Sequence, residues 1–180
     1  MKRWIITVLG KDRPGIVAGV TKTLYQLACN LEDSAMTRLE GEFAIMLIFS
    51  GPARLTPERV ERAFAALARR MRLTVHLKPL SKQETRTPHA RGRTYRISVY
   101  GADRPGIVFR IAEVLARARA NITDVHTHRS TGVGPSLYLT LLEVELPPRS
   151  SPASLEQTLR RAAARLGVEV SLRAVETEVL

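Results

Sequence analysis

Two loops of nearly identical sequence carry the residues best suited to chemistry in this chain. The octapeptide Gly-Lys-Asp-Arg-Pro-Gly-Ile-Val at 10–17 returns at 101–108 with only its second residue changed. In each copy an aspartate offers a carboxylate to a cation such as an ammonium group, and a glycine leaves room for a ligand beside backbone amides. Amides at a helix start are largely unpaired and can receive a carboxylate. The combination suits a small zwitterion.

Each residue type in the loop also has an expected structural role. In the first copy, Gly10 is expected to leave a strand at backbone angles barred to other residues. Asp12 is expected to cap the following helix, and Pro14 to fix its first turn. The second copy has the same residues at Gly101, Asp103 and Pro105. Neither Gly-x-Gly-x-x-Gly nor Gly-Lys-Ser/Thr occurs at these loops, so phosphate binding is not supported.

A purely structural interpretation of the loops stays open beside the zwitterion interpretation. Each loop could be a well-formed strand-to-helix turn and no more. In that case Asn30 and Asn121, at equal distances from the two loops, would serve as left-handed helix terminators.

The residues around each loop predict one order of elements twice: strand, helix, strand, strand, helix, strand. Apolar or alternating runs rich in β-branched residues indicate the strands. The first helix of each half follows the loop, with apolar residues at three-to-four spacing over about 15 residues. Thr56 and Pro57 form a helix-start signal, and Val60, Phe64, Leu67 and Met71 supply a core stripe. Strands are expected at 3–9, 31–39, 43–49 and 73–77, and again at 95–100, 122–129, 137–146 and 168–175.

This pattern predicts an α+β fold class with two ferredoxin-like βαββαβ domains. Right-handed crossovers close each domain as a four-stranded antiparallel sheet with both helices on one face. The domains are expected at 1–79 and 93–180, joined by a basic, proline-containing linker at 80–92. The other face of each sheet is left uncovered. Pairing of sheets or edges is therefore expected between the halves or between chains, which predicts a homo-oligomer.

At these residues the chain resembles the ACT domain family, whose small regulatory modules bind amino acids. The resemblance lies in a strand, the repeated octapeptide, an amphipathic helix, and then Asn-Leu at 30–31 or Asn-Ile at 121–122 opening a second strand. The tandem arrangement without a catalytic domain is similar to the glycine cleavage system transcriptional repressor group. The resemblance implies a regulatory protein and no enzyme, without cofactors. It would sense a small amino acid, glycine or similar, and alter its contact with a partner such as a transcription regulator.

The resemblance also implies where the amino acid is held. A ligand lies between two ACT units, touched by the glycine-containing loop of one and by the start of the second strand of the other. The implied ligand-binding residues are Asp12, Arg13, Pro14, Gly15, Ile16 and Asn30, with Asp103, Arg104, Pro105, Gly106, Ile107 and Asn121. The halves differ at Lys11 and Ala102 and in a longer turn at 131–135. The two sites therefore need not be equivalent.

The net charge of +11 raises the alternative of a nucleic-acid-binding protein. Residues 1–77 carry a net +5, residues 78–96 another +5 and residues 97–180 only +1, so nearly half of the excess lies in and around the connector. Aromatic residues make up 5% of the chain, too few for stacking residues interleaved with the basic ones. Solvated helix faces and a basic linker are the plainer explanation. No helix-turn-helix pattern is present.

A metal-dependent enzyme is the weaker alternative. Asp124, His126 and His128 alternate along a predicted strand, which places them on one face where two imidazoles could bind a metal. No third ligand is evident nearby. Ser34, Ser130 and Ser136 lack the context of a nucleophile elbow.

Cysteine content and hydropathy constrain the chain further. The single cysteine, Cys29, is expected to be a buried structural thiol. No apolar run approaches the ~20 residues of a membrane span, and the start of the chain does not have the pattern of a signal peptide. We therefore expect a cytoplasmic protein.

Overall fold

A computed structural model describes residues 1–81, 93–130 and 136–175. The chain divides into two compact units, Met1–Thr87 and Pro88–Leu180. Leu80 ends a strand, and the rest of the predicted linker lies outside the described residues except for Ser81. The longer turn predicted at 131–135 lies outside them as well.

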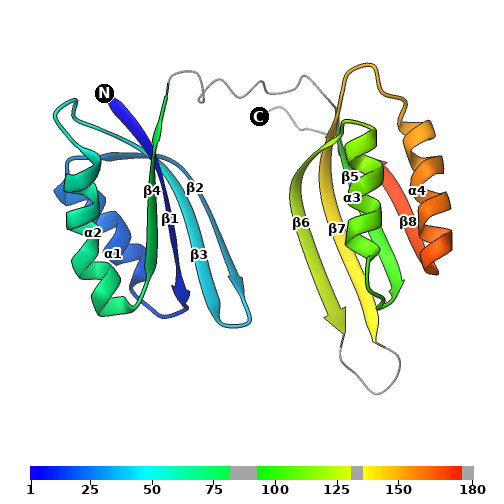
Figure 1. The fold of residues 1–180 in the computed structure, drawn as a ribbon, viewed down its shortest axis with the longest axis horizontal. Helices are drawn as coiled ribbons and strands as arrows, with labels where there is room; N and C mark the ends of the chain where they lie inside the picture. Colours follow the sequence, from blue (N-terminus) through cyan, green and yellow to red (C-terminus); the bar gives the residue numbers. More distant parts are fainter. Residues whose placement is uncertain (82–92, 131–135, 176–180) are drawn as a thin grey trace. The chain divides into compact units, whose positions relative to one another are not determined.

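Both units have the predicted βαββαβ order of elements (Figure 1). The first unit contains β1 (Lys2–Lys11), α1 (Ile16–Gln26), β2 (Asn30–Leu39), β3 (Glu42–Gly51), α2 (Pro57–Met71) and β4 (Thr74–Leu80). The second contains β5 (Arg93–Ala102), α3 (Ile107–Arg117), β6 (Asn121–Ser130), β7 (Leu137–Leu146), α4 (Pro152–Leu166) and β8 (Val168–Ala174). The strand orders are β2-β3-β1-β4 and β6-β7-β5-β8, with all neighbours antiparallel. Both helices of a unit cover one face of its sheet, which confirms the predicted fold class.

Each unit has its own hydrophobic core between the sheet and its helices. In the first unit Trp4 stacks on Phe49 with ring centroids 5.5 Å apart. The predicted stripe of α2 is buried against them, as expected from its spacing. The helix-start signal is also confirmed, because the Thr56 hydroxyl accepts a hydrogen bond from the Arg59 amide and Pro57 opens α2.

The first helix of each unit ends earlier than predicted. Helix α1 has 11 residues, and the left-handed residue after it is Ala28, at φ 55°. The equivalent residue after α3 is Arg119, at φ 54°. Asn30 and Asn121 are instead the first residues of β2 and β6. The alternative in which they terminate the helices is therefore wrong, which leaves the two asparagines without that structural explanation.

The first glycine of each octapeptide is required because a side chain there would clash with neighbouring residues, and not because its backbone angles are unusual. A Cβ on Gly10 would lie 2.8 Å from the Leu73 side chain, and one on Gly101 would lie 2.8 Å from that of Val168. Among the described residues, positive φ values in glycine occur at other positions. The prediction that these two glycines let the chain leave the strand is wrong, because β1 and β5 continue through them and pack closely on the chain where the last strand of each unit begins, at Leu73 and Val168.

The sheet face opposite the helices is open in both units. Strand pairing places Leu9, Met46 and Leu39 on this face of the first unit, and between 47% and 68% of each is exposed. In the second unit the corresponding exposed apolar residues are Tyr100, Leu137, Leu139 and Leu141. The expected uncovered apolar face is thus present on each unit.

Candidate functional site

The loop between β1 and α1 leaves the start of the helix open. Gly15 is the N-cap residue, with a φ of 93°, and its carbonyl accepts a hydrogen bond from the Gly19 amide at 2.8 Å. A Cβ added to Gly15 would meet nothing within 4 Å, so the glycine is required by its backbone conformation and the space above it is free. Gly106 repeats this arrangement at the start of α3, with a φ of 92°.

Neither aspartate of the loops caps its helix, contrary to the prediction. No side chain caps α1 or α3, since Gly15 and Gly106 hold the cap positions. Pro14 precedes the cap and so does not lie in the first helical turn, and the same holds for Pro105. The first amides of both helices are therefore left without a side-chain acceptor, and an anion could bind there.

Each loop aspartate is held by the hairpin beside it. The Asp12 amide donates to the Gly41 carbonyl at 2.9 Å, and its carboxylate accepts from Arg38 Nη1 at 3.2 Å. In the second unit the Asp103 amide donates to the Ser136 carbonyl at 3.1 Å. The Asp103 carboxylate lies 3.7 Å from Arg129 Nη1. Both loops thus present a carboxylate that already faces a cation.

Arg38 and Arg129 are not among the site residues predicted from the sequence. They are separated by 91 residues, the same offset as the two loops, and this repetition was the signal that could have identified them. Their side chains are 69% and 61% exposed, so both guanidinium groups remain accessible to a ligand. Each aspartate–arginine pair offers one acceptor for an ammonium group and one donor for a carboxylate.

The structure does not bring the loop and the asparagine of one unit together. Asn30 pairs with Ser50, which pairs with Arg3 near the start of β1, whereas the loop follows the other end of β1. At ~3.3 Å per residue the two lie about 30 Å apart along the strand. Asn121 is likewise placed at the far end of its sheet from the second loop, opposite Glu145. A site using both features must therefore combine two units.

The surroundings of the two asparagines differ. A β-bulge follows each one, between Leu31 and Asp33 in β2 and between Ile122 and Asp124 in β6. In the first unit the bulge residue is Glu32, whose carboxylate lies 2.6 Å from Arg3. Hydrogen bonds from the Ser50 hydroxyl and from Arg3 hold the pKa of Glu32 below its usual value. In the second unit Thr123 takes this place and carries no charge.

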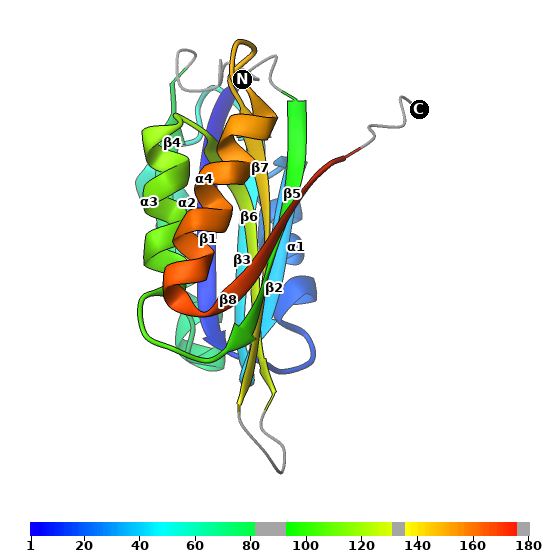
Figure 2. The same cartoon turned by 90° about the vertical axis from the view of Figure 1, so that its right-hand side faces the viewer.

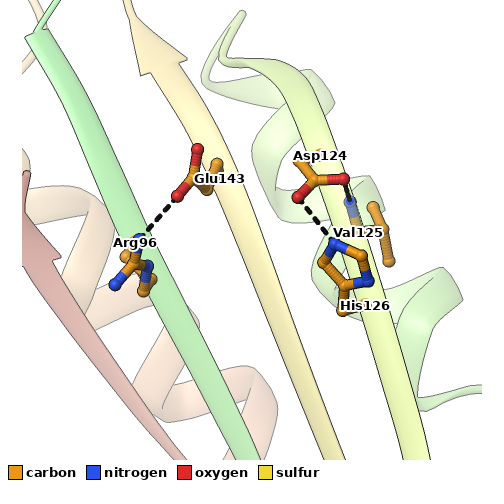
Figure 3. Close-up of polar contacts among 5 residues, drawn as sticks. All are labelled: Arg96, Asp124, Val125, His126 and Glu143. Carbon is orange, nitrogen blue, oxygen red and sulfur yellow. Dashed lines mark hydrogen bonds and ion pairs between the residues drawn. The ribbon is translucent and has the colours of Figure 1, made fainter. Parts of the chain in front are cut away.

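The two histidines suspected of metal binding lie on the open face of the second sheet. His126 Nε2 lies 3.0 Å from one oxygen of Asp124, whose other oxygen accepts from the Val125 amide at 3.0 Å (Figure 3). On the neighbouring strands, Arg96 and Glu143 form an ion pair at 2.7 Å. Among the described residues no group of three or more His, Cys, Asp or Glu side chains could hold a metal ion. The geometry shows one surface ion pair and one contact between a histidine and a carboxylate, and it gives no support for a metal centre there.

Cys29 packs against the first core and is half-buried. Burial raises the pKa of its thiol, and Sγ donates a weak hydrogen bond to the Leu27 carbonyl at 3.8 Å. The thiol is therefore protonated at neutral pH, as a structural cysteine would be.

Comparison with known proteins places these features in a family context. A family model described as the ACT domain matches residues 2–78 and again 95–173. The chain is 24% identical over 173 residues to the glycine cleavage system transcriptional repressor of Escherichia coli, covering 95% of this chain and 89% of that protein. It is 33% identical over 73 residues to a UPF0237 protein of Streptococcus mutans, covering 41% of this chain and 83% of that protein.

Solved structures with the same two-unit fold are also known. A protein of unknown function from Galdieria sulphuraria matches 97% of this chain and 99% of its own, with 26% identity and a TM-score of 0.78. A protein provisionally named as a glycine cleavage system transcriptional repressor matches 98% of both chains, with 20% identity and a TM-score of 0.71. No helix in the described parts of the chain is long and apolar enough to span a membrane.

Proposed function

Because the chain belongs to the ACT domain family, we propose that this regulatory protein binds a small amino acid at its two repeated loops. The observation that carries the proposal is the open helix start beside an aspartate–arginine pair, present in both units. Helix amides and the arginine would receive the carboxylate of the ligand, and the aspartate would receive its ammonium group. The residues proposed at these loops are Asp12 to Ile16 and Asp103 to Ile107, to which we add Arg38 and Arg129.

The other half of each site comes from the asparagine of a different unit. Asn30 and Asn121 lie at the ends of their sheets remote from the loops, so a loop can meet an asparagine only when two units pair. The apolar residues exposed on both sheets favour such pairing, within one chain or between chains. We propose a homo-oligomer or an intrachain pair of ACT units as the binding form.

Ligand binding would alter the contact of this protein with a partner protein. The relative from Escherichia coli is named as a transcriptional repressor, which makes a transcription regulator the first partner to test. Within the described residues, at least one strand lies between any two consecutive helices. Those residues therefore contain no helix-turn-helix motif. Regulation through a partner accounts for this arrangement, and for such a regulator we propose a cytoplasmic location.

Isothermal titration against glycine, serine, the branched-chain and the aromatic amino acids tests the proposal. One small amino acid should bind saturably, and Asp103→Ala or Asn121→Ala should weaken it. The matched changes Asp12→Ala and Asn30→Ala show whether the first loop also binds. Absence of heat from every amino acid at millimolar concentration would contradict the proposal. Steeply salt-dependent binding of DNA by the same protein would instead favour the nucleic-acid alternative.

A further inference from the structure

A basic groove runs between the two helices of the second unit, on the side away from the sheet. Helices α3 and α4 lie side by side across one face of the sheet (Figure 2). The groove between them has a volume of about 630 Å³. Four arginines line it: Arg110 and Arg117 on α3, and Arg161 and Arg165 on α4.

The two walls of the groove differ in how their charge is compensated. Glu113 pairs with Arg110 at 3.2 Å and with Arg117 at 2.8 Å, and so compensates part of the α3 wall. Within the described residues, Arg161 and Arg165 have no carboxylate within ion-pair distance. The α4 wall therefore presents two guanidinium groups, one helical turn apart, that are available to an acidic ligand.

The floor of the groove is apolar. Val114, Ala162 and Leu166 line it and are half-buried. Beside it, Phe109 is 61% exposed, and the Arg110 guanidinium lies 5.3 Å from its ring centroid. A ligand that fits this groove has apolar groups along one line and negative charges on its flanks.

The fold itself does not require this surface, because the first unit lacks it. Aligning α1 with α3 and α2 with α4 places Gly19, Gln26 and Ala66 where Arg110, Arg117 and Arg161 stand. Of the four groove arginines, only Arg165 has an arginine at the equivalent position of the first unit, Arg70. Residues 97–180 carry a net charge of only +1, yet α3 and α4 contain five arginines and two glutamates. The positive charge of this unit is concentrated on its helices.

We propose that the groove between α3 and α4 is a docking site for an acidic amphipathic helix of a partner protein. Apolar residues of that helix would lie on Val114, Ala162 and Leu166, and its carboxylates would pair with Arg161 and Arg165. A nucleic acid fits less well, because its phosphates make no use of the apolar residues that line the groove. The proposal does not depend on amino-acid binding at the loops.

The test is fluorescence anisotropy with the full chain and a labelled synthetic peptide of about 15 residues. The peptide carries leucines at helical spacing on one face and glutamates on both flanks. A scrambled peptide of the same composition and a random-sequence DNA duplex serve as comparison probes. The amphipathic peptide should bind saturably and more tightly than either.

Reversing the charge of two arginines on α4 tests whether the peptide binds in the groove. Arg161→Glu with Arg165→Glu should weaken the amphipathic peptide at least about tenfold. The matched change Arg70→Glu, on the equivalent face of α2, should leave it unchanged. All three arginines are exposed, so the variants should keep the far-ultraviolet circular dichroism of the parent. Four results would overturn the proposal: no peptide binding at millimolar protein, equal binding of the scrambled peptide, an equal loss from Arg70→Glu, or tighter binding of the duplex.

Discussion

Replacing the cap glycine of one loop by alanine should destabilise that unit by a defined amount. Gly15 has a φ of 93°, and an added Cβ meets nothing within 4 Å, so the cost of Gly15→Ala is conformational and not steric. The left-handed conformation destabilises an L-residue by about 1–2 kcal/mol. The alanine also lowers the conformational entropy of the unfolded chain, which offsets about 0.4–1 kcal/mol of that cost. The net destabilisation of the first unit should be about 1 kcal/mol. Gly15→Asn should cost less, because asparagine tolerates this region better.

The single tryptophan makes the measurement specific to one unit. Trp4 is 1% exposed in the first core and stacks on Phe49, so its fluorescence reports unfolding of that unit. Circular dichroism reports both units. In urea, with a slope near 1 kcal/mol/M for a small domain, Gly15→Ala should lower the fluorescence midpoint by about 1 M. Gly106→Ala, the matched change in the second unit, should shift the circular dichroism curve and leave the fluorescence midpoint in place.

An unchanged fluorescence midpoint in Gly15→Ala would refute the backbone argument. A loss above about 3 kcal/mol would refute the claim of free space, because that size of effect needs a steric clash. Equal fluorescence shifts in Gly15→Ala and Gly106→Ala would contradict independent unfolding of the two units.

Four further predictions follow from particular contacts. Thr56→Ala removes the cap of α2 and should cost the first unit about 1 kcal/mol in urea denaturation, whereas Thr56→Ser should retain most of it. Glu32 has a folded-state pKa below its usual 4.5, so its contribution is present above that pH and lost as the pH falls through the folded value. In Glu32→Gln, the fluorescence-monitored stability of the first unit should therefore fall less steeply on acidification, and an unchanged slope would contradict the assignment. Cys29 should react slowly with iodoacetamide at neutral pH in the folded chain and fast in urea; fast labelling of the folded chain would contradict its burial. Arg129→Ala should weaken amino-acid binding as Asp103→Ala does, whereas Arg149→Ala, remote in sequence from the loops, should not.

The repeat and the hydrophobic patterns were enough to predict the fold. The apolar stripe of α2, its Thr56-Pro57 start and the alternation of the strands each have a local cause, so the sequence contains them directly. The left-handed turns at Ala28 and Arg119 could not be predicted this way. Neither residue type is typical of that conformation, and both residues lie where the chain passes from the first helix of a unit to its second strand.

The candidate site was less predictable, because its contacts are long-range. The two aspartates have the residue type of a helix cap, but a glycine takes that position and each carboxylate turns to an arginine on the second strand. That partner lies 26 residues further along the chain in each unit, and only the strand register brings it to the loop. The separation of Asn30 from Asp12 likewise follows from register and not from any local pattern.

Amide chemical shifts of the 15N-labelled chain, titrated with the amino acid found by calorimetry, test the central claim most directly. We predict saturable shifts at the loop, around Gly15 or Gly106, together with shifts at Asn30 or Asn121 at the far end of a sheet. Shifts absent from both loops at saturating ligand, or confined to the helix faces, would contradict binding of an amino acid at the repeated loops.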